Sequence, residues 1–341
     1  MNVKLIPAWL CLVAVPAAVR AQLPNASQQV EVMQQRRQVE SLAGLGGDTN
    51  AVPEFYAGED SDVGPQSVVQ LKARHPRFTV AADVQYFYTD NMFLTRNDKK
   101  GSDVMVDTAQ AALEPAPREL GGGSFAPRIG FEQQWYNYGL AERSSFTAYD
   151  PALPGDTTAR RNSFDFNAQT VSLDGKWYRG PWTVCIGGDY RRLLETGDYD
   201  QFYTEFVPRW AVERAFELSR TTGLSLGYEG TYRITETVLT SPGLDATSNN
   251  RTDHSLVLTG SWKLCGHAVL QPYYRFEYSH YTGIRRDDYL NSFGLALYYP
   301  LCRHAALRAF AGYDHLNTDG AYVDSYDNLT AGGGLSLTIA F

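Results

Sequence analysis

The stretch YDNLTAGGGLSLTIAF, residues 326–341, decides the fold. From Leu329 onward the odd positions are mostly apolar and end in Leu337, Ile339 and Phe341, whereas the even positions are small or polar. Successive side chains of a β-strand point to opposite faces, so a period of two is that of a strand. The stretch therefore predicts a strand with one apolar face. An edge strand of a soluble sandwich is the alternative.

The composition is that of an ordered protein, because 43% of the 341 residues are hydrophobic, 13% aromatic and 20% charged. No run of about 18 apolar residues occurs, so no membrane-spanning helix is expected. The formal net charge of −8 argues against nucleic-acid binding. Any part that spans a membrane must therefore be built from strands.

Residues 1–21 have the pattern of a secretory signal peptide. Lys4 precedes an apolar stretch at 5–15, and Val19 and Ala21 suit cleavage before Gln22. Residues 22–76 are rich in Gln and then in acidic side chains, which predicts a short helix within 25–45. We expect this segment to lie in the periplasm or inside the lumen of the domain that follows, residues 77–341.

The same alternation recurs from residue 77 onward. In WTVCIGGDYR, residues 182–191, Trp182, Ile186 and Tyr190 share one face. Trp182 and Tyr190 would be about 26 Å apart along a strand, or roughly 20 Å in membrane depth at a tilt of about 40°. This spacing suits two aromatic girdles around an apolar band. The fold class predicted is all-β, a transmembrane antiparallel up-and-down β-barrel.

Twelve strands are predicted, with the connections between them in two classes. The predicted strands are residues 77–91, 103–114, 126–140, 162–178, 181–193, 202–213, 218–235, 252–264, 267–281, 287–299, 304–316 and 326–341. Connections after even strands are mostly short, and those after odd strands, such as 140–161, are mostly longer. Outer-membrane barrels have short periplasmic turns and longer outer loops. Both termini are therefore expected on the periplasmic side.

A few residues depart from the pattern. Pro208 and Pro272 fall inside predicted strands, where a missing N–H donor predicts a bulge at each. Phe164 and Phe166 are out of phase with Val171, which predicts a bulge or an extension beyond the membrane. The glycines at 332–334 predict close packing against a neighbour or a bulge.

The face opposite the aromatic side chains carries ionisable residues of both signs. The lumen-lining candidates are Asp83, Arg128, Glu132, Asp189, Arg191, Glu205, Arg209, Glu229, Arg233, Arg275, Glu277, Arg308 and Asp314, with Asp174 and Lys176 on the same face. Such residues either brace the wall through ion pairs or line a constriction whose field sorts solutes. Both roles can hold at once.

Enzyme and metal motifs are not found. The six His residues show no HExxH spacing, and no GxSxG motif occurs. Cys185, Cys265 and Cys302 have no spacing typical of a zinc site, although one pair could be oxidised after export. We expect no enzymatic activity, no metal and no cofactor.

Two short sequence features resemble those of a known class. Residues 88–94, YTDNMFL, resemble the Y-x-D-N-x-F motif that opens the barrel in porin-like outer-membrane protein families of Gram-negative bacteria. Phe341, closing the last strand, resembles the assembly signal of outer-membrane β-barrels. The resemblance implies a barrel of the porin kind and assigns no site residues.

The function predicted is that of an outer-membrane channel for passive diffusion of small hydrophilic solutes. The expected partners are outer-membrane lipid, the barrel-assembly machinery and the solutes. One alternative is a filled barrel with a structural or surface-interaction role, and another is a barrel-borne lipid hydrolase. The sequence leaves open the solute, whether the lumen is open, and whether the chain forms a homo-oligomer.

Overall fold

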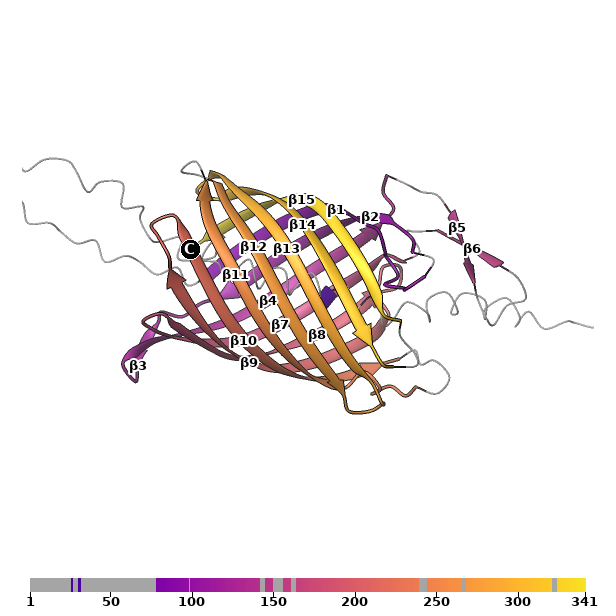
Figure 1. Cartoon of the computed structure of the whole chain (residues 1–341), viewed down its shortest axis with the longest axis horizontal. Helices are drawn as coiled ribbons and strands as arrows, with labels where there is room; N and C mark the ends of the chain where they lie inside the picture. The colour runs from indigo at the N-terminus through magenta and orange to yellow at the C-terminus, as the bar shows by residue number, and fades with distance from the viewer. Residues whose placement is uncertain are drawn as a thin grey trace, which may run out of the picture.

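The computed structural model describes residues 26, 30–31, 78–97, 99–141, 145–149, 156–160, 164–238, 244–264, 268–320 and 324–341, with 145–149 and 156–160 as backbone only. Most of this part of the chain is β-strand (Figure 1). The strands are β1 (Phe78–Thr89), β2 (Ser102–Leu113), β3 (Arg118–Leu120), β4 (Gly123–Tyr138), β5 (Ser145–Tyr149), β6 (Asp156–Arg160), β7 (Phe166–Arg179), β8 (Trp182–Glu195), β9 (Gln201–Glu217), β10 (Thr222–Thr237), β11 (Arg251–Leu264), β12 (Ala268–Tyr281), β13 (Asp287–Cys302), β14 (Ala305–Thr318) and β15 (Tyr326–Ala340). Among the described residues, no helix is long and apolar enough to cross a membrane.

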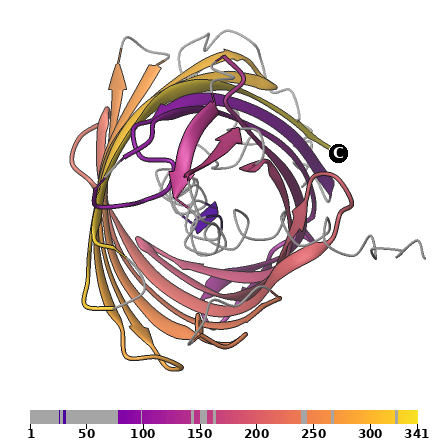
Figure 2. The ribbon, with the colours of Figure 1, turned by 90° about the vertical axis from the view of Figure 1, so that its right-hand side faces the viewer.

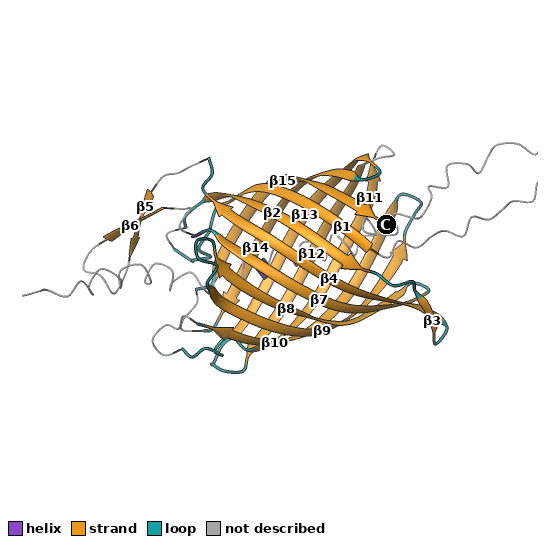
Figure 3. Cartoon of the chain, turned by 180° about the vertical axis from the view of Figure 1, so that it is seen from behind, coloured by secondary structure: helices purple, strands orange, loops and turns teal. Residues whose placement is uncertain are grey.

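Twelve strands close into one antiparallel ring, seen end-on in Figure 2. β1 pairs with β15 and β2 pairs with β4, so the ring has no free edge. The short β3 pairs with β4 outside the ring, and β5 and β6 form a separate hairpin (Figure 3). The predicted twelve-stranded barrel is confirmed. Closure satisfies the backbone groups that an open sheet edge would leave unpaired.

The connections differ between the two ends of the barrel. At what we call the short-turn end they are 114–122, 180–181, 218–221, 265–267 and 303–304. At the opposite, long-loop end they are 90–101, 139–165, 196–200, 238–250, 282–286 and 319–325. The connections are mostly shorter at the short-turn end than at the long-loop end, as predicted. The exceptions are 114–122, which is long, and 196–200 and 282–286, which are short.

Large apolar side chains cover the outside of the wall. Ile186 and Leu173 are 69% and 60% exposed. Near the long-loop end, Tyr278 and Tyr289 lie with their ring centroids 5.2 Å apart. Near the short-turn end, Trp182 is also exposed. Because soluble proteins seldom expose contiguous apolar patches of more than a few hundred Å², this outer band with its aromatic borders suits lipid.

The two prolines lie inside strands without the predicted bulges. β9 and β10 keep one register on both sides of Pro208, and β11 and β12 do so across Pro272. The prediction was wrong because a proline removes one N–H donor, and a local gap in pairing with one neighbour accommodates this loss without an extra residue. Register shifts lie instead at 193–194 and at 300–302.

Phe164 and Phe166 are buried on the inner side of the barrel. β7 begins at Phe166 and pairs in unbroken register with β4 and β8, so no bulge is present. The Phe166 ring stacks on that of Tyr136 with 4.4 Å between centroids. The two phenylalanines are out of phase with Val171 because Val171 faces outward, where it is 47% exposed.

Gly332 allows β15 to pass close to β1. A Cβ atom there would lie 2.3 Å from Cβ of Phe87 and 2.4 Å from the carbonyl oxygen of Tyr86. β15 keeps a regular register with both neighbouring strands through residues 332–334. Of the two predicted explanations for the triple glycine, close packing is confirmed and a bulge is not present.

Candidate functional site

Ionisable side chains gather on the inner side of the ring. None of the residues predicted to line the lumen is exposed. The buried ones are Asp189, Arg191, Glu205, Arg233, Arg275, Glu277 and Asp314, and the half-buried ones are Asp83, Arg128, Glu132, Arg209, Glu229 and Arg308. Asp174 is buried and Lys176 is half-buried. Alternation places these groups inward, because their strand neighbours, such as Ile186 and Tyr190, are exposed on the outside.

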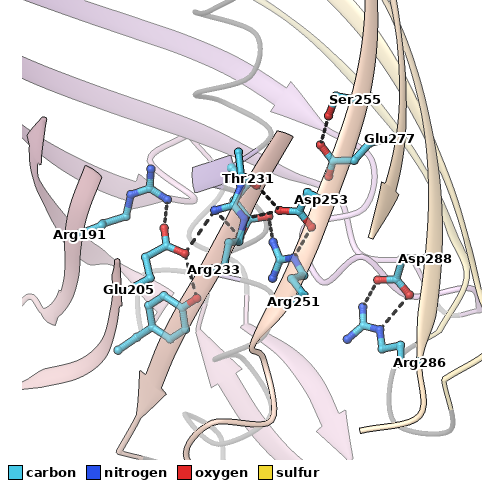
Figure 4. A network of polar contacts seen from close by, with 12 residues as sticks. Arg191, Glu205, Thr231, Arg233, Arg251, Asp253, Ser255, Glu277, Arg286 and Asp288 are labelled. Atoms are coloured by element: carbon cyan, nitrogen blue, oxygen red, sulfur yellow. Dashed lines mark hydrogen bonds and ion pairs between the residues drawn. The ribbon is translucent and has the colours of Figure 1, made fainter. Parts of the chain in front are cut away.

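A buried ion network joins four neighbouring strands near the long-loop end (Figure 4). Arg191 on β8 pairs with Glu205 on β9. Glu205 Oε2 lies 3.3 Å from Arg233 Nη1 on β10, and Arg233 Nε donates to Asp253 Oδ2 on β11 at 2.5 Å. Arg251 Nε donates to the other oxygen of Asp253 at 2.9 Å. The charges alternate in sign, so each buried guanidinium has a carboxylate beside it, which offsets its desolvation.

Glu31 joins this network from inside the barrel. Its Oε2 accepts a hydrogen bond from Arg251 Nη2 at 2.5 Å, and its Oε1 lies 3.4 Å from Arg233 Nη1. Its side chain is 6% exposed. In Figure 2 this piece of the N-terminal segment is the short indigo ribbon within the ring.

Of residues 22–76, the structure describes Ala26, Val30 and Glu31, all with helical backbone, and Val30 has no exposed surface. These three residues lie within the ring. The rest of that segment and the signal peptide predicted at 1–21 lie outside the described residues.

Arg275 is the centre of a second network, on β10, β11 and β12. Its Nη2 donates to Glu277 Oε2 at 2.6 Å and to Ser255 Oγ at 2.8 Å. Its Nη1 lies 3.7 Å from Glu229 Oε2. One guanidinium therefore faces two carboxylates, and this cluster needs no further anion.

Arg209 holds two carboxylates on neighbouring strands. Its Nη2 donates to Asp174 Oδ1 at 2.5 Å, and its Nη1 lies 3.2 Å from Asp189 Oδ2. Arg308 on β14 lies 3.5 Å from Asp83 on β1. The predicted inward charges are thus joined mostly across strands.

Side chains on the inner face are more exposed toward the short-turn end. Arg128 Nε donates to Glu114 Oε1 at 3.0 Å, and both side chains are 41% exposed. The Arg191 side chain in the network near the long-loop end is only 2% exposed. Glu132 accepts a hydrogen bond from Gln110 and is half-buried. Water therefore reaches the polar face of the barrel near the short turns.

An apolar cluster packs the interior at the long-loop end. Its buried members are Val30, Phe87, Met92, Val104, Val106, Tyr136, Tyr138, Phe164, Phe166, Ala168, Leu193, Phe202 and Tyr203. All except Val30 come from the barrel and its loops. Val30 therefore attaches the N-terminal segment by apolar contact next to the ion pairs of Glu31.

Sequence reasoning did not include among the candidates the residues that complete the ion pairs near the long-loop end. These are Glu31, Arg251, Asp253, Arg286 and Asp288. Asp253 follows the alternation set by the outward Leu256 and Leu258, so the same period could have found it. No pattern pointed to Glu31, because it belongs to a segment without strand periodicity.

Residues 88–94 join the first loop of the long-loop end to the last strand. The buried Asn91 donates through Nδ2 to the carbonyl oxygens of Thr95 at 2.7 Å and Asp327 at 2.9 Å. Asp90 accepts a hydrogen bond from the backbone N–H of Leu329 at 2.6 Å. These contacts lie at the β1–β15 seam, where the barrel closes.

The pKa values of two loop carboxyl groups at the long-loop end are shifted in opposite directions. Burial raises the pKa of Asp165 to about 6, against the lowering effect of a hydrogen bond from the Tyr138 backbone N–H at 2.7 Å. Hydrogen bonds from Ser248 and Thr247 hold the pKa of Asp245 below its usual value.

Side chains suited to catalysis or metal binding do not converge within the described ranges. Asp314 is buried, whereas the adjacent His315 reaches Asp327 on the outside, with Nδ1 2.7 Å from Oδ1. No group of three or more His, Cys, Asp or Glu residues among those described is placed to hold a metal ion. Cys185 and Cys302 are free thiols, and Cys265 lies outside the described residues.

No family model matches the sequence, and no curated protein matches it. Solved structures of similar fold include an outer-membrane channel from Pseudomonas putida F1, at 11% identity over 83% of this chain and 100% of that chain, with a TM-score of 0.46. The translocator domain of the autotransporter NalP from Neisseria meningitidis aligns at 11% identity over 93% and 99% of the two chains, with a TM-score of 0.42. An anion-selective porin from Comamonas acidovorans aligns at 10% identity over 77% and 98%, with a TM-score of 0.36.

Proposed function

We propose that the chain forms a channel in the bacterial outer membrane for passive diffusion of small hydrophilic solutes. The observation that carries this proposal is the inner face near the short-turn end, where ion-paired side chains such as Arg128 and Glu114 keep 41% of their surface exposed. A closed barrel with an apolar outside and a hydrated polar inside is the architecture of a water-filled pore. The proposed role is not enzymatic and uses no cofactor.

The lumen-lining residues would act on solutes through their charges. The side chains proposed for this role are Asp83, Arg128, Glu132, Asp189, Arg191, Glu205, Arg209, Glu229, Arg233, Arg275, Glu277, Arg308 and Asp314. The charges nearest to water, Arg128 and Glu132 among them, would set ion preference, because a fixed charge in a narrow pore acts at short range. The more buried pairs would brace the wall.

A specific observation favours the filled barrel as a second candidate function. Val30 and Glu31 are buried inside the ring next to the apolar cluster, so the long-loop end is narrowed by part of the N-terminal segment. In a filled barrel the loops and the outer surface would carry the function instead. Outer-membrane lipid and the barrel-assembly machinery are the partners proposed in both cases, with Phe341 as the assembly signal.

Liposome swelling separates the two functions. Vesicles that contain the refolded protein should swell in isotonic solutions of small sugars, at rates that fall steeply as the sugar grows. We expect only a narrow path, because barrel diameter grows roughly linearly with strand number and side chains already fill an eight-stranded barrel. Swelling rates equal to those of protein-free vesicles would favour the filled barrel.

A further inference from the structure

The ion network on β8 to β11 has an excess positive charge when only the barrel wall is counted. The wall supplies the guanidiniums of Arg191, Arg233 and Arg251, but only the carboxylates of Glu205 and Asp253. Among the described residues, the third carboxylate comes from Glu31 in the N-terminal segment. A buried guanidinium without a partner is costly, so this part of the wall favours an anion.

Arg233 and Arg251 define the position at which an anion would bind. Arg251 is held from both sides, because its Nε donates to Asp253 and its Cζ lies 5.4 Å from the centroid of the Tyr281 ring. Its Nη2 is thereby turned toward the lumen, where it meets Glu31. Arg233 is fixed in the same way by Asp253 and Glu205. Two fixed guanidiniums that face one carboxylate suit the planar geometry of that group.

Glu31 fills this place incompletely. Its Oε2 has a short hydrogen bond from Arg251, at 2.5 Å. Its Oε1 is buried and accepts no hydrogen bond from the residues that the structure describes, although Arg233 Nη1 lies 3.4 Å away. A carboxylate that is not tethered to a backbone could move closer to Arg233 and satisfy both oxygens.

We propose that Arg233 and Arg251 form a binding site for the carboxylate group of small anionic solutes, and that the Glu31 side chain occupies this site as an intramolecular substitute. The second network does not offer such a site, because Arg275 already faces the carboxylates of Glu229 and Glu277. Binding at the site does not depend on conduction. Its consequence, a preference of the long-loop half for carboxylates, rests on the proposed channel function.

Chemical rescue with propionate tests the site. The full chain is refolded in detergent as wild type, Glu31→Ala and a control, Glu229→Gln, and the midpoint of heat unfolding is followed by gel mobility. Each protein is measured in sodium propionate and in sodium chloride of equal ionic strength at neutral pH. Wild type should have the same midpoint in both salts, because the tethered Glu31 side chain occupies the site and excludes propionate.

Glu31→Ala should unfold at a lower temperature than wild type in chloride. Propionate should raise its midpoint progressively, in proportion to the logarithm of its concentration once the site is mostly filled, as a ligand that binds only the folded state does. Glu229→Gln should show no propionate-specific shift, since this change leaves one guanidinium facing one carboxylate. Adding Arg251→Gln to Glu31→Ala should abolish the rescue.

The proposal is overturned if propionate and chloride give the same midpoint for Glu31→Ala, or if the propionate shift survives Arg251→Gln. If Glu31→Ala does not fold in chloride, the folding yield in each salt replaces the midpoint, with the same two outcomes deciding. If propionate has no specific effect, the proposed carboxylate site is rejected, and the swelling experiment still tests the channel function. If the vesicles do not swell, the channel function is rejected, and the propionate experiment still tests the site.

Discussion

The Glu205 carboxylate lies between the guanidiniums of Arg191 and Arg233, and the Tyr203 hydroxyl donates to it at 3.1 Å. One side chain thereby links three neighbouring strands inside the barrel. Glu205→Gln should lower the free energy of unfolding by about 3–5 kcal/mol, because it removes the carboxylate that pairs with the buried Arg191 and one of the carboxylates that pair with Arg233. Urea unfolding in lipid vesicles measures this change. Glu217→Gln, at an exposed position, is the control and should change it by less than about 0.5 kcal/mol. Equal effects of the two variants would show that the network does not brace the wall.

Gly332→Ala should reduce the yield of folded barrel. The new Cβ would meet the backbone oxygen of Tyr86 and Cβ of Phe87, neither of which can move without disturbing the β1–β15 seam. A steric conflict of this kind typically costs about 1–3 kcal/mol. Heat-modified gel mobility after refolding gives the folded fraction. Gly197→Ala, where a Cβ would have nothing within 4 Å, should fold like wild type. A Gly332→Ala protein that folds equally well would contradict the close packing.

Asp165→Asn should stabilise the protein at neutral pH and have little effect at pH 4. The raised pKa means that the folded protein binds this proton more tightly than the unfolded chain. The corresponding stability is fully present below the ordinary pKa of an Asp and is lost as the pH rises through about 6. After a discount for partial exposure we expect a gain of about 1–2 kcal/mol at pH 7.5. The Asn side chain keeps an acceptor for the Tyr138 N–H.

Unfolding midpoints of wild type and Asp165→Asn across pH 4–8 measure the effect, and they should diverge above pH 5. Asp245→Asn is the control with the opposite sign. Hydrogen bonds lower the pKa of Asp245, so its contribution is present above the ordinary pKa and is lost on acidification. Parallel curves for wild type and Asp165→Asn would show that Asp165 is not desolvated in the folded protein.

The long-loop end should face the outside of the cell. A cysteine at Thr247 should react with a membrane-impermeant maleimide added to intact cells, whereas a cysteine at Arg303 should react only after the outer membrane is opened. Both positions are exposed, one at each end of the barrel. The background is the chain with its native cysteines replaced by Ser. Labelling of the Arg303 position in intact cells would show the opposite orientation.

The fold could be predicted from the sequence because a lipid-facing wall imposes a strict period of two. Strands such as β8 carry this period along most of their length, with Trp182, Ile186 and Tyr190 outward and Asp189 and Arg191 inward. The exceptions have local causes. The inward direction of Phe166 was not predicted, because inward side chains were expected to be polar, whereas the interior at the long-loop end is apolar.

The pairing inside the barrel could be predicted only in part. Periodicity shows that Arg191 and Glu205 share the inner side, but it does not say which oxygen meets which guanidinium, since this depends on the stagger between strands. The role of Glu31 could not be predicted from the sequence, because its partners Arg233 and Arg251 are far from it in sequence and its segment has no repeat that fixes a register.

Conductance in planar lipid bilayers tests the channel function most directly. The protein is inserted as the full chain, as the chain lacking residues 22–76, and as Arg128→Ala. We predict stepwise conductance, larger without residues 22–76 because Val30 and Glu31 then no longer occupy the long-loop end. In Arg128→Ala the preference should shift toward cations, since Glu114 loses its paired positive charge. Folded protein that gives no conductance steps, with or without residues 22–76, would contradict a channel.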